Sequence, residues 1–144
     1  MTYNQIIINT DGGSRGNPGP SAVGITAVTE TGELLFEISE YIGHQTNNVA
    51  EYTAVIHALN HLLEHKLTTS SLLFVLDSEL IVRQITGRYQ VKEPTLKTLN
   101  SQVKNILLEL KTRGLYKSIS FENVLREKNK RADFLVNQAL DNLQ

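Results

Sequence analysis

The stretch Ile6-Ile7-Ile8-Asn9-Thr10-Asp11-Gly12-Gly13-Ser14-Arg15-Gly16-Asn17-Pro18-Gly19-Pro20 decides how this chain is interpreted. Residues 6–10 are mostly β-branched and apolar, which predicts a buried strand. That strand delivers the carboxylate of Asp11 directly into a glycine-rich, sharply turning loop. Glycines in such a loop allow another backbone to approach closely. An acid held at this point indicates a functional site.

Three further acids stand in similarly unusual places. Glu51 follows an asparagine pair at the start of a helical pattern, Asp77 ends an apolar run, and Asp133 follows a basic segment. If the four acids converge, their mutual repulsion raises their pKa values unless cations compensate. Carboxylates are ligands of hard divalent cations, and two such ions stabilise both reacting oxygens of a phosphoryl displacement. The residues therefore predict a Mg²⁺ or Mn²⁺ site and hydrolysis of a phosphodiester.

These acids also have simpler structural interpretations. Asn48-x-x-Glu51 matches a capping box, in which Glu51 reaches back to a backbone N–H. Asp77 could act as the N-cap of the helix that follows it. The basic segment before Asp133 either places positive charge beside the acidic centre or forms a solvated helix start. Its charged residues are Arg126, Lys128, Lys130 and Arg131.

Hydrophobic periodicity predicts one α/β domain that spans residues 1–144. The run at 72–76 is apolar throughout, which is typical of a strand covered on both faces in a parallel arrangement. The expected architecture is a mixed sheet with helices on its faces. Strands are expected at 6–10, 21–29 and 34–42 as an antiparallel meander, and then at 72–76 and 118–124. Helices are expected from 47 or 48 to about 65, from 78 to 86, from 94 to 113 and from 130 to 143.

Composition narrows the class of protein. The chain has 144 residues, enough to bury roughly two-thirds of its unfolded surface, and its lack of cysteine excludes disulfides and thiolate ligands. A net charge of −1 gives no overall attraction for a polyanion, so nucleic-acid contacts must come from local patches. The apolar runs are too short to cross a bilayer, and residues 1–5 do not resemble a signal peptide. We expect a cytoplasmic monomer with no membrane partner.

The histidines do not clearly indicate a metal or acid–base site, and the glycine-rich loop does not match a nucleotide-binding loop. His57, His61 and His65 recur every four residues on the polar face of the expected helix and are predicted to face solvent, whereas His44 lies in a turn. The loop at 12–19 lacks the Gly-Lys-Ser/Thr ending of a nucleotide-binding loop and does not lead into a helix. Its glycines suit a close approach to a nucleic-acid strand.

Taken together, these motifs resemble those of type 1 ribonucleases H over essentially the whole chain. The resemblance implies the ribonuclease H-like fold, a five-stranded mixed sheet of strand order 3-2-1-4-5 with helices on both faces. It also implies a Mg²⁺-dependent endonuclease, with Mn²⁺ able to replace Mg²⁺, that hydrolyses the RNA strand of RNA/DNA hybrids and leaves 3′-hydroxyl and 5′-phosphate ends. The matching pieces are Thr10-Asp11-Gly12-Gly13 with Gly16-Asn17-Pro18-Gly19-Pro20, Thr46-Asn47-Asn48-x-x-Glu51, Asp77-Ser78, and Asn129-x-x-x-Asp133.

The resemblance also implies roles for individual residues. Asp11, Glu51, Asp77 and Asp133 would be the catalytic, metal-binding acids for two ions, with Asp11 and Asp77 holding both. Glu51 would lie near the 2′-hydroxyl beside the scissile bond, which favours RNA over DNA. Asn17 and Asn48 would contact the minor groove, and Thr46 a phosphate of the DNA strand. The residues expected to contact nucleic acid are Gly12, Gly13, Asn17, Thr46, Asn47, Asn48, Ser78 and Glu79.

The sequence departs from many bacterial members in three places. The loop at 125–130 lacks the histidine that helps product leave, and it is similar to the Arg-Glu-x-Asn loop of archaeal-type members, so Arg126, Glu127 and Asn129 are its candidate residues. The segment between Gly87 and Pro94 is too short for a basic protrusion, which predicts modest, salt-dependent binding. Glu79 replaces a glutamine and adds negative charge near the RNA path.

Other functions remain open on the sequence. A silent module of the same fold would bind hybrid without cleaving it, but the four intact acids argue against this. Another nuclease of the superfamily, such as a DNA nuclease or a transposase-type core, would lack the asparagine pair and the 16–20 motif in this form. Double-stranded RNA is a further candidate substrate or partner.

Overall fold

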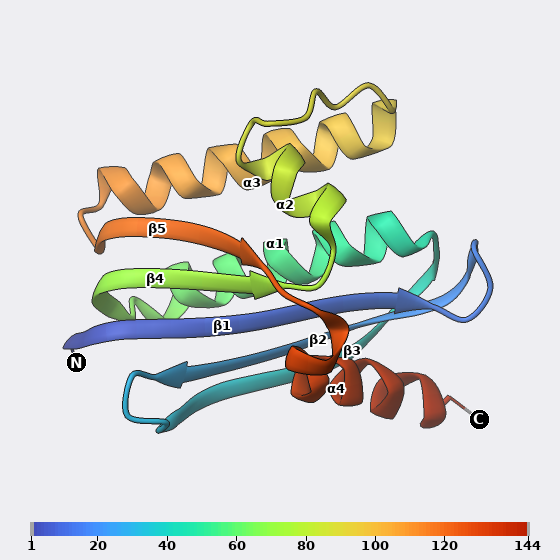
Figure 1. The fold of residues 1–144 in the computed structure, drawn as a ribbon, viewed down its shortest axis with the longest axis horizontal. Helices are drawn as coiled ribbons and strands as arrows, with labels where there is room; N and C mark the ends of the chain where they lie inside the picture. The colour runs from blue at the N-terminus through green and yellow to red at the C-terminus, as the bar shows by residue number, and fades with distance from the viewer. Residues whose placement is uncertain (1, 144) are drawn as a thin grey trace.

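The central strand of the molecule is β1, and the sheet extends from it in both directions (Figure 1). The computed structural model describes residues 2–143. The strand order is β3-β2-β1-β4-β5, with β1–β2 and β2–β3 antiparallel and β1–β4 and β4–β5 parallel. This confirms the mixed sheet of order 3-2-1-4-5 expected from the family resemblance. The strands are β1 (Thr2–Ser14), β2 (Gly19–Thr29), β3 (Leu34–Gln45), β4 (Thr68–Leu76) and β5 (Tyr116–Asn123).

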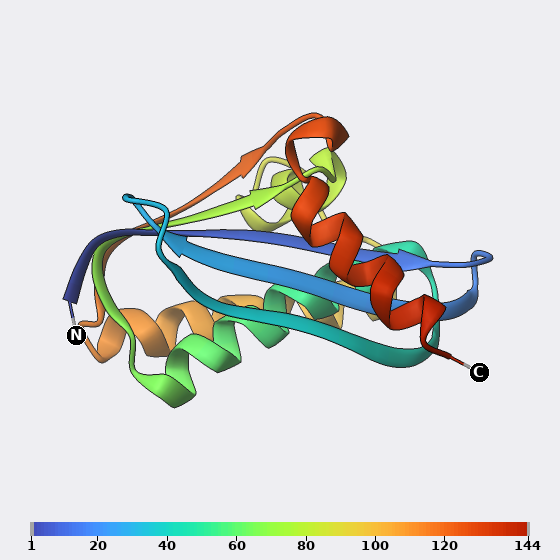
Figure 2. The same cartoon turned by 90° about the horizontal axis from the view of Figure 1, so that it is seen from below.

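Helices cover both faces of this sheet, as Figure 2 shows. On one face α1 packs against β1 and β2, and α3 packs against α1. On the opposite face α4 lies across β2, β1 and β3. The helices are α1 (Asn47–His65), α2 (Glu79–Ile85), α3 (Pro94–Thr112) and α4 (Lys130–Asp141), with a short 3₁₀ turn at Arg126–Lys128. Within residues 2–143 we find no helix with the length and apolar character required to cross a membrane.

The core lies between β1, β4 and the two long helices. Ile6 and Ile8 of β1 and Leu72 and Phe74 of β4 are fully buried. Their alternation with less buried neighbours is the period of a strand, so every second side chain enters the core. The apolar run predicted at 72–76 is therefore a strand, but its predicted cover on both faces is incomplete, because Leu73 is only half-buried and α4 lies over β1, β2 and β3 instead.

The end of β1 differs from the sequence prediction. The glycine-rich loop was expected to begin after Asp11, but β1 continues to Ser14, and Gly12 and Gly13 pair with Val23 and Ala22 of β2. The reversal is confined to residues 15–18. Glycine usually weakens a strand, but at Gly12 the absence of a side chain lets the backbone of α1 come close to β1. Asp11 thus lies inside a paired strand.

The helix caps also settle the two structural alternatives for the acids. Thr46 is the N-cap of α1, and its hydroxyl oxygen accepts a hydrogen bond from the Val49 N–H at 3.3 Å. Ser78 is the N-cap of α2 and accepts from the Ile81 N–H at 3.3 Å. The capping-box interpretation of Glu51 and the N-cap interpretation of Asp77 are therefore both wrong. Both carboxylates are free for another use.

Candidate active site

Asp11 and Asp77 lie side by side because β1 and β4 are parallel neighbours. The register pairs Asn9 of β1 with Val75 of β4, and each acid stands two residues further along its own chain. Asp77 directly follows the last residue of β4. Ligands bind outside the carboxyl ends of strands in sheets of this kind. The parallel pairing therefore joins two acids that are 66 positions apart in the sequence.

Glu51 reaches this point from the first turns of α1, because Gly12 lets the helix approach β1. A Cβ atom at Gly12 would lie 2.1 Å from the carbonyl carbon and oxygen of Ala50 and 2.5 Å from the Glu51 nitrogen. The absence of a side chain at Gly12 thus sets the distance between strand and helix. The Gly12 N–H donates a hydrogen bond of 2.6 Å to Glu51 Oε1. Glu51 is consequently fixed by the strand that carries Asp11.

Asp133 lies on the other face of the sheet, where a second glycine lets a helix approach closely. Gly24 is the antiparallel partner of Asp11, and a Cβ atom at Gly24 would lie 2.1 Å from the carbonyl oxygen of Ala132. Helix α4 therefore crosses β2 at a position where a side chain does not fit. This crossing places the first turn of α4, with Asp133, over Asp11. Two glycines thus bring two helices onto one acid from opposite faces.

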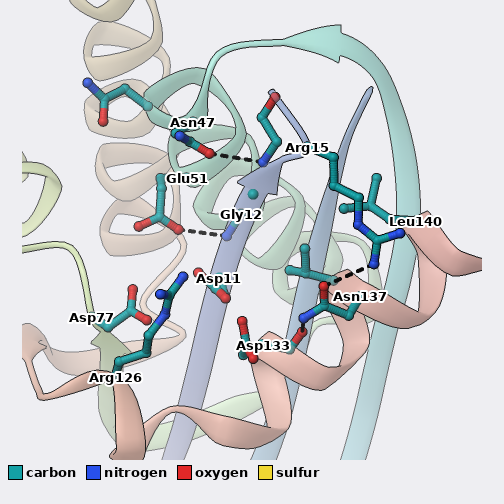
Figure 3. A pocket seen from close by; sticks show the side chains of 14 residues that line it. Asp11, Gly12, Arg15, Asn47, Glu51, Asp77, Arg126, Asp133, Asn137 and Leu140 are labelled. Atoms are coloured by element: carbon teal, nitrogen blue, oxygen red, sulfur yellow. Dashed lines mark hydrogen bonds between the residues drawn. The ribbon is translucent and has the colours of Figure 1, made fainter. Parts of the chain in front are cut away.

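The four predicted acids line a single pocket, shown in Figure 3. Each of Asp11, Glu51 and Asp77 offers a carboxylate oxygen, and these oxygens all lie within 4.8 Å of one another. Asp133 lies on the wall of the same pocket, beside this group of three. Asp11 and Glu51 are buried and Asp77 is half-buried. The predicted convergence of the acids is confirmed for this pocket.

Burial is the main influence on the protonation of these acids. It raises the pKa of Asp11 to about 7, with smaller contributions from the charges of Asp77 and Asp133. Burial, followed by repulsion from Asp11, raises the pKa of Glu51 well above its usual range. Burial also raises the pKa of Asp77, although the Arg126 guanidinium opposes this rise. The sequence-based argument named repulsion as the cause, but loss of hydration is the larger effect.

The donor set fits a divalent metal ion. All of the ligand atoms are carboxylate oxygens, which select hard cations such as Mg²⁺ or Mn²⁺. Among the described residues, Arg15 and Arg126 are the cations that line the pocket, and Arg15 is paired with Asp141 at 2.6 Å. The buried negative charge therefore exceeds the positive charge that the chain supplies there. A bound divalent cation would remove that imbalance.

The residues of the predicted basic segment point in different directions in the structure. Arg126 lines the pocket beside Asp77 (Figure 3). Arg131 is turned away, because its guanidinium makes two hydrogen bonds of 2.7 Å to the Glu37 carboxylate and lies 5.0 Å from the Phe134 ring centroid. Lys128 and Lys130 are exposed. Positive charge beside the acids thus comes from Arg126, and the rest of the segment is a solvated helix start.

Asn129 and Glu127 occupy contrasting positions in the loop. Asn129 is 1% exposed, accepts a hydrogen bond of 2.9 Å from Asn9 Nδ2 and donates one of 2.9 Å to the Thr10 carbonyl oxygen. It therefore ties the start of α4 to β1, one residue before Asp11. Glu127 is exposed and lies outside the set of residues that line the pocket.

Four of the residues expected to contact nucleic acid, Asn17, Thr46, Asn47 and Asn48, form a rim beside the acids. The Asn17 amide oxygen accepts from the Asn47 N–H at 3.0 Å, and the Asn47 amide oxygen accepts from the Ser14 N–H at 2.9 Å. These bonds engage the oxygens, so the NH₂ group of each amide remains a donor. Asn17, Thr46 and Asn48 line a second hollow next to the acidic pocket.

Gly13, Asn48, Ser78 and Glu79 complete the predicted set. Gly13 and Asn48 line the acidic pocket, with Gly13 packed closely against α4. Ser78 caps α2. Glu79 begins α2, is exposed and lies 3.4 Å from the Arg83 Nε atom. The extra negative charge predicted at this position is therefore partly balanced by a neighbouring cation.

Sequence reasoning missed several residues that build the site. Gly24 admits α4, and Asn9 holds Asn129, yet neither belongs to a motif. Arg15 donates a hydrogen bond of 3.2 Å to the Asn137 amide oxygen, and Asn137 Nδ2 donates one of 3.0 Å to the Asp133 carbonyl oxygen. A glycine inside the alternating strand 21–29 was the sequence signal that could have revealed Gly24, because a glycine within a strand often marks a close backbone approach.

Comparison with known proteins places the chain in a family. A family model described as reverse transcriptase-like matches residues 9–139. LC11-RNase H1, isolated from compost and solved in complex with an RNA/DNA hybrid, superposes with a TM-score of 0.86 at 48% identity, covering 94% of this chain and 96% of that one. The chain belongs to the type 1 ribonuclease H family.

Two curated relatives extend this result. Ribonuclease HI of Halobacterium salinarum is 37% identical over 131 residues, which cover 91% of this chain and 62% of that protein. A bifunctional protein of Mycobacterium tuberculosis is 38% identical over 138 residues, 95% of this chain and 36% of that protein. The chain thus spans about a third of the mycobacterial relative and under two-thirds of the halobacterial one.

Proposed function

We propose that this chain is an endonuclease that hydrolyses the RNA strand of RNA/DNA hybrids and leaves 3′-hydroxyl and 5′-phosphate ends. The observation that carries the proposal is the group of carboxylate oxygens from Asp11, Glu51 and Asp77, all within 4.8 Å, in a pocket that Asp133 also lines. Membership of a family that includes an enzyme solved with an RNA/DNA hybrid supports the choice of substrate.

Two Mg²⁺ ions are the proposed cofactor, with Mn²⁺ able to replace them. Asp11, Glu51, Asp77 and Asp133 would hold the ions, and Asp11 and Asp77 would contact both. When bound, such ions activate the attacking water and neutralise charge on the attacking and leaving oxygens. The chain itself contributes rigidity, because Asp11 lies in a paired strand and Glu51 is fixed by the Gly12 N–H. Fixed carboxylates need no rearrangement during the reaction.

The rim beside the acids is the proposed contact surface for the hybrid. Asn17, Asn47 and Asn48 would donate their NH₂ groups to sugar and base atoms in the minor groove, and Thr46 would donate its hydroxyl to a DNA phosphate. Gly12 and Gly13 line the pocket, so the RNA strand would pass their backbone. Ser78 and Glu79 at the start of α2 would lie along the RNA path. Discrimination of RNA from DNA is assigned to Glu51.

Arg126 is the residue of the loop that we propose acts in product release. Its side chain lines the pocket and its charge influences the Asp77 carboxylate. A guanidinium at this position can attract the new 5′-phosphate away from the acids, since it binds phosphate in a bidentate manner. Glu127 is exposed and Asn129 is buried, so their proposed contributions are to loop conformation.

Cleavage of end-labelled duplexes tests the function. The purified protein is incubated with RNA/DNA, RNA/RNA and DNA/DNA duplexes of one sequence, each with Mg²⁺, with Mn²⁺ and with chelator. We expect the protein to cut the RNA of the hybrid at internal positions and only when metal is added. The Asp11→Asn variant should not cleave. Hybrid binding without cleavage by the wild type would indicate a silent binding module. Cleavage of DNA/DNA would indicate another nuclease of this fold, and cleavage of RNA/RNA would widen the substrate range.

A further inference from the structure

Three of the chain's four histidines form a ridge along α1, on the turns that follow Glu51. His57, His61 and His65 recur every four residues, which places them on one face of the helix. The ring centroids of His61 and His65 lie 4.1 Å apart with an interplanar angle of 35°. The prediction that all three face solvent is wrong for His57 and His61, which are half-buried, and correct for His65. We call these three residues the histidine ridge.

The edge strand β3 holds two of the three rings in place. Phe36 stacks on His61, with ring centroids 3.9 Å apart at 30°. Glu40 Oε2 lies 3.4 Å from His57 Nδ1. Phe36, His61 and His65 therefore form a continuous row of rings, and His57 lies beside Glu40.

We infer that the histidine ridge binds one borderline divalent cation, Zn²⁺ being the reference ion, with His61 and His65 as the pair of ligands. Imidazole nitrogens suit Zn²⁺, Ni²⁺ and Cu²⁺, whereas carboxylate oxygens suit Mg²⁺ and Mn²⁺. Two histidines at positions i and i+4 on one helix face form the metal-binding pair of known helical zinc motifs. The chain thus carries two sites that select different metals by ligand chemistry.

Metal binding requires the His65 ring to turn, because the two rings lie over one another with their planes 35° apart and a ligand nitrogen of each must point at the ion. Zn–N bonds of about 2.0–2.1 Å place the ring centroids of two histidines on one ion roughly 5 Å apart. The observed separation of 4.1 Å is less than an ångström short of this. His65 is exposed and can turn outward, while Phe36 holds His61.

Metal bound at the ridge would stabilise the fold independently of catalysis. A ligand that binds the folded state and not the unfolded state adds stability that grows with its concentration. Here the ion would bridge successive turns of α1, whose rings already contact β3 through Phe36 and Glu40. Nothing in this effect depends on the nuclease proposal, since the acidic pocket lies at the other end of α1 with Glu51.

Calorimetric titration with Zn²⁺ tests the inference. Untagged protein is titrated at neutral pH in excess Mg²⁺, so that the acidic cluster does not compete for Zn²⁺, and the melting temperature is recorded with and without Zn²⁺. His61→Ala and His65→Ala are the test variants. His44→Ala is the matched control, because His44 is the fourth histidine and lies outside the ridge. Asp11→Asn reports any binding at the acids.

The inference is supported if the wild-type protein binds one Zn²⁺ per chain and its melting temperature rises with Zn²⁺. The His44→Ala and Asp11→Asn variants should give the same two results. Binding should fall about tenfold or more in His61→Ala and in His65→Ala. Absence of binding in the wild type would overturn the inference. So would binding that survives in both ridge variants, or binding that is lost in Asp11→Asn. Hydrolysis assays are not needed for either result.

Discussion

The Gly12 N–H and the Glu51 Oε1 atom are joined by a hydrogen bond of 2.6 Å, at a point where the backbone of α1 leaves no room for a side chain on β1. This bond makes the position of a helix-borne acid depend on the strand that carries Asp11. The helix can come this close because residue 12 has no side chain. The geometry of the acidic pocket is therefore set by backbone contacts, and substitutions outside the four acids should disturb it.

Gly12→Ala should damage both the fold and the pocket. Its methyl group would lie 2.1 Å from the Ala50 carbonyl, so α1 must move away, and Glu51 with it. We expect a loss of about 2–4 kcal/mol in the free energy of unfolding and near-complete loss of hydrolysis. Gly13→Ala is the control, because its methyl group meets a side-chain atom of Val136 at 3.3 Å. Urea denaturation with equal stability for both variants would contradict the close-approach argument.

The metal-free protein should lose stability as pH rises from about 4 to about 7. The folded pKa of Asp11, about 7, exceeds its unfolded value near 4, so the folded state binds the extra proton in this window. The stabilisation is complete at pH values below the window and is lost through it, by about 2–4 kcal/mol. Urea denaturation with chelator at several pH values measures the slope. Asp11→Asn should flatten it, and an unchanged slope in that variant would refute the assignment.

Arg126→Ala should slow turnover while leaving the fold intact. The variant removes the cation that lines the pocket beside Asp77 and opposes the rise in its pKa. We expect kcat to fall roughly tenfold or more and the acidic limb of the pH–rate profile to move to higher pH. Steady-state kinetics across pH measure both. Lys128→Ala, at an exposed cation outside the pocket, serves as the control; identical kinetics for the two variants would exclude a role for the guanidinium.

Asn129→Ala should destabilise the junction of β1 and α4. The variant loses the bonds to Asn9 and to the Thr10 carbonyl and leaves these buried partners unpaired. A cost of about 1–3 kcal/mol is expected, with reduced activity because Asp133 follows on α4. Thermal unfolding and hydrolysis rates provide the measurements. Asn105→Ala, on the exposed side of α3, should change neither the stability nor the hydrolysis rate. Equal effects of the two substitutions would contradict a structural role for the Asn129 hydrogen bonds.

Glu79→Gln should strengthen hybrid binding at low salt. The substitution removes a negative charge at the start of α2 and frees Arg83, now 3.4 Å from Glu79. We expect a few-fold lower KM at low ionic strength, and the gain should shrink as salt is added. Glu109→Gln breaks a similar pair with Arg113 elsewhere on the surface and is the matched control. A gain of equal size in the control would show that net charge alone is responsible.

The sequence alone determined the elements of this fold and the identity of its acids. Alternation of period two and helical periodicity placed the strands and helices, because local side-chain burial follows the geometry of each element. The four acids were found because each stands where its neighbours are apolar, basic or turn-forming. Boundaries were less certain: β1 was expected to stop before the glycines, since glycine usually weakens a strand, but Gly12 and Gly13 remain paired.

Tertiary structure alone decided how the acids meet. The Asn9–Val75 register aligns Asp11 with Asp77, and Gly12 and Gly24 admit α1 and α4 from opposite faces. These are contacts between segments far apart in sequence, and no local pattern encodes the distance between a glycine and the helix that crosses it. The same holds for the burial that raises the pKa of Asp11, because loss of hydration depends on everything that surrounds the carboxylate.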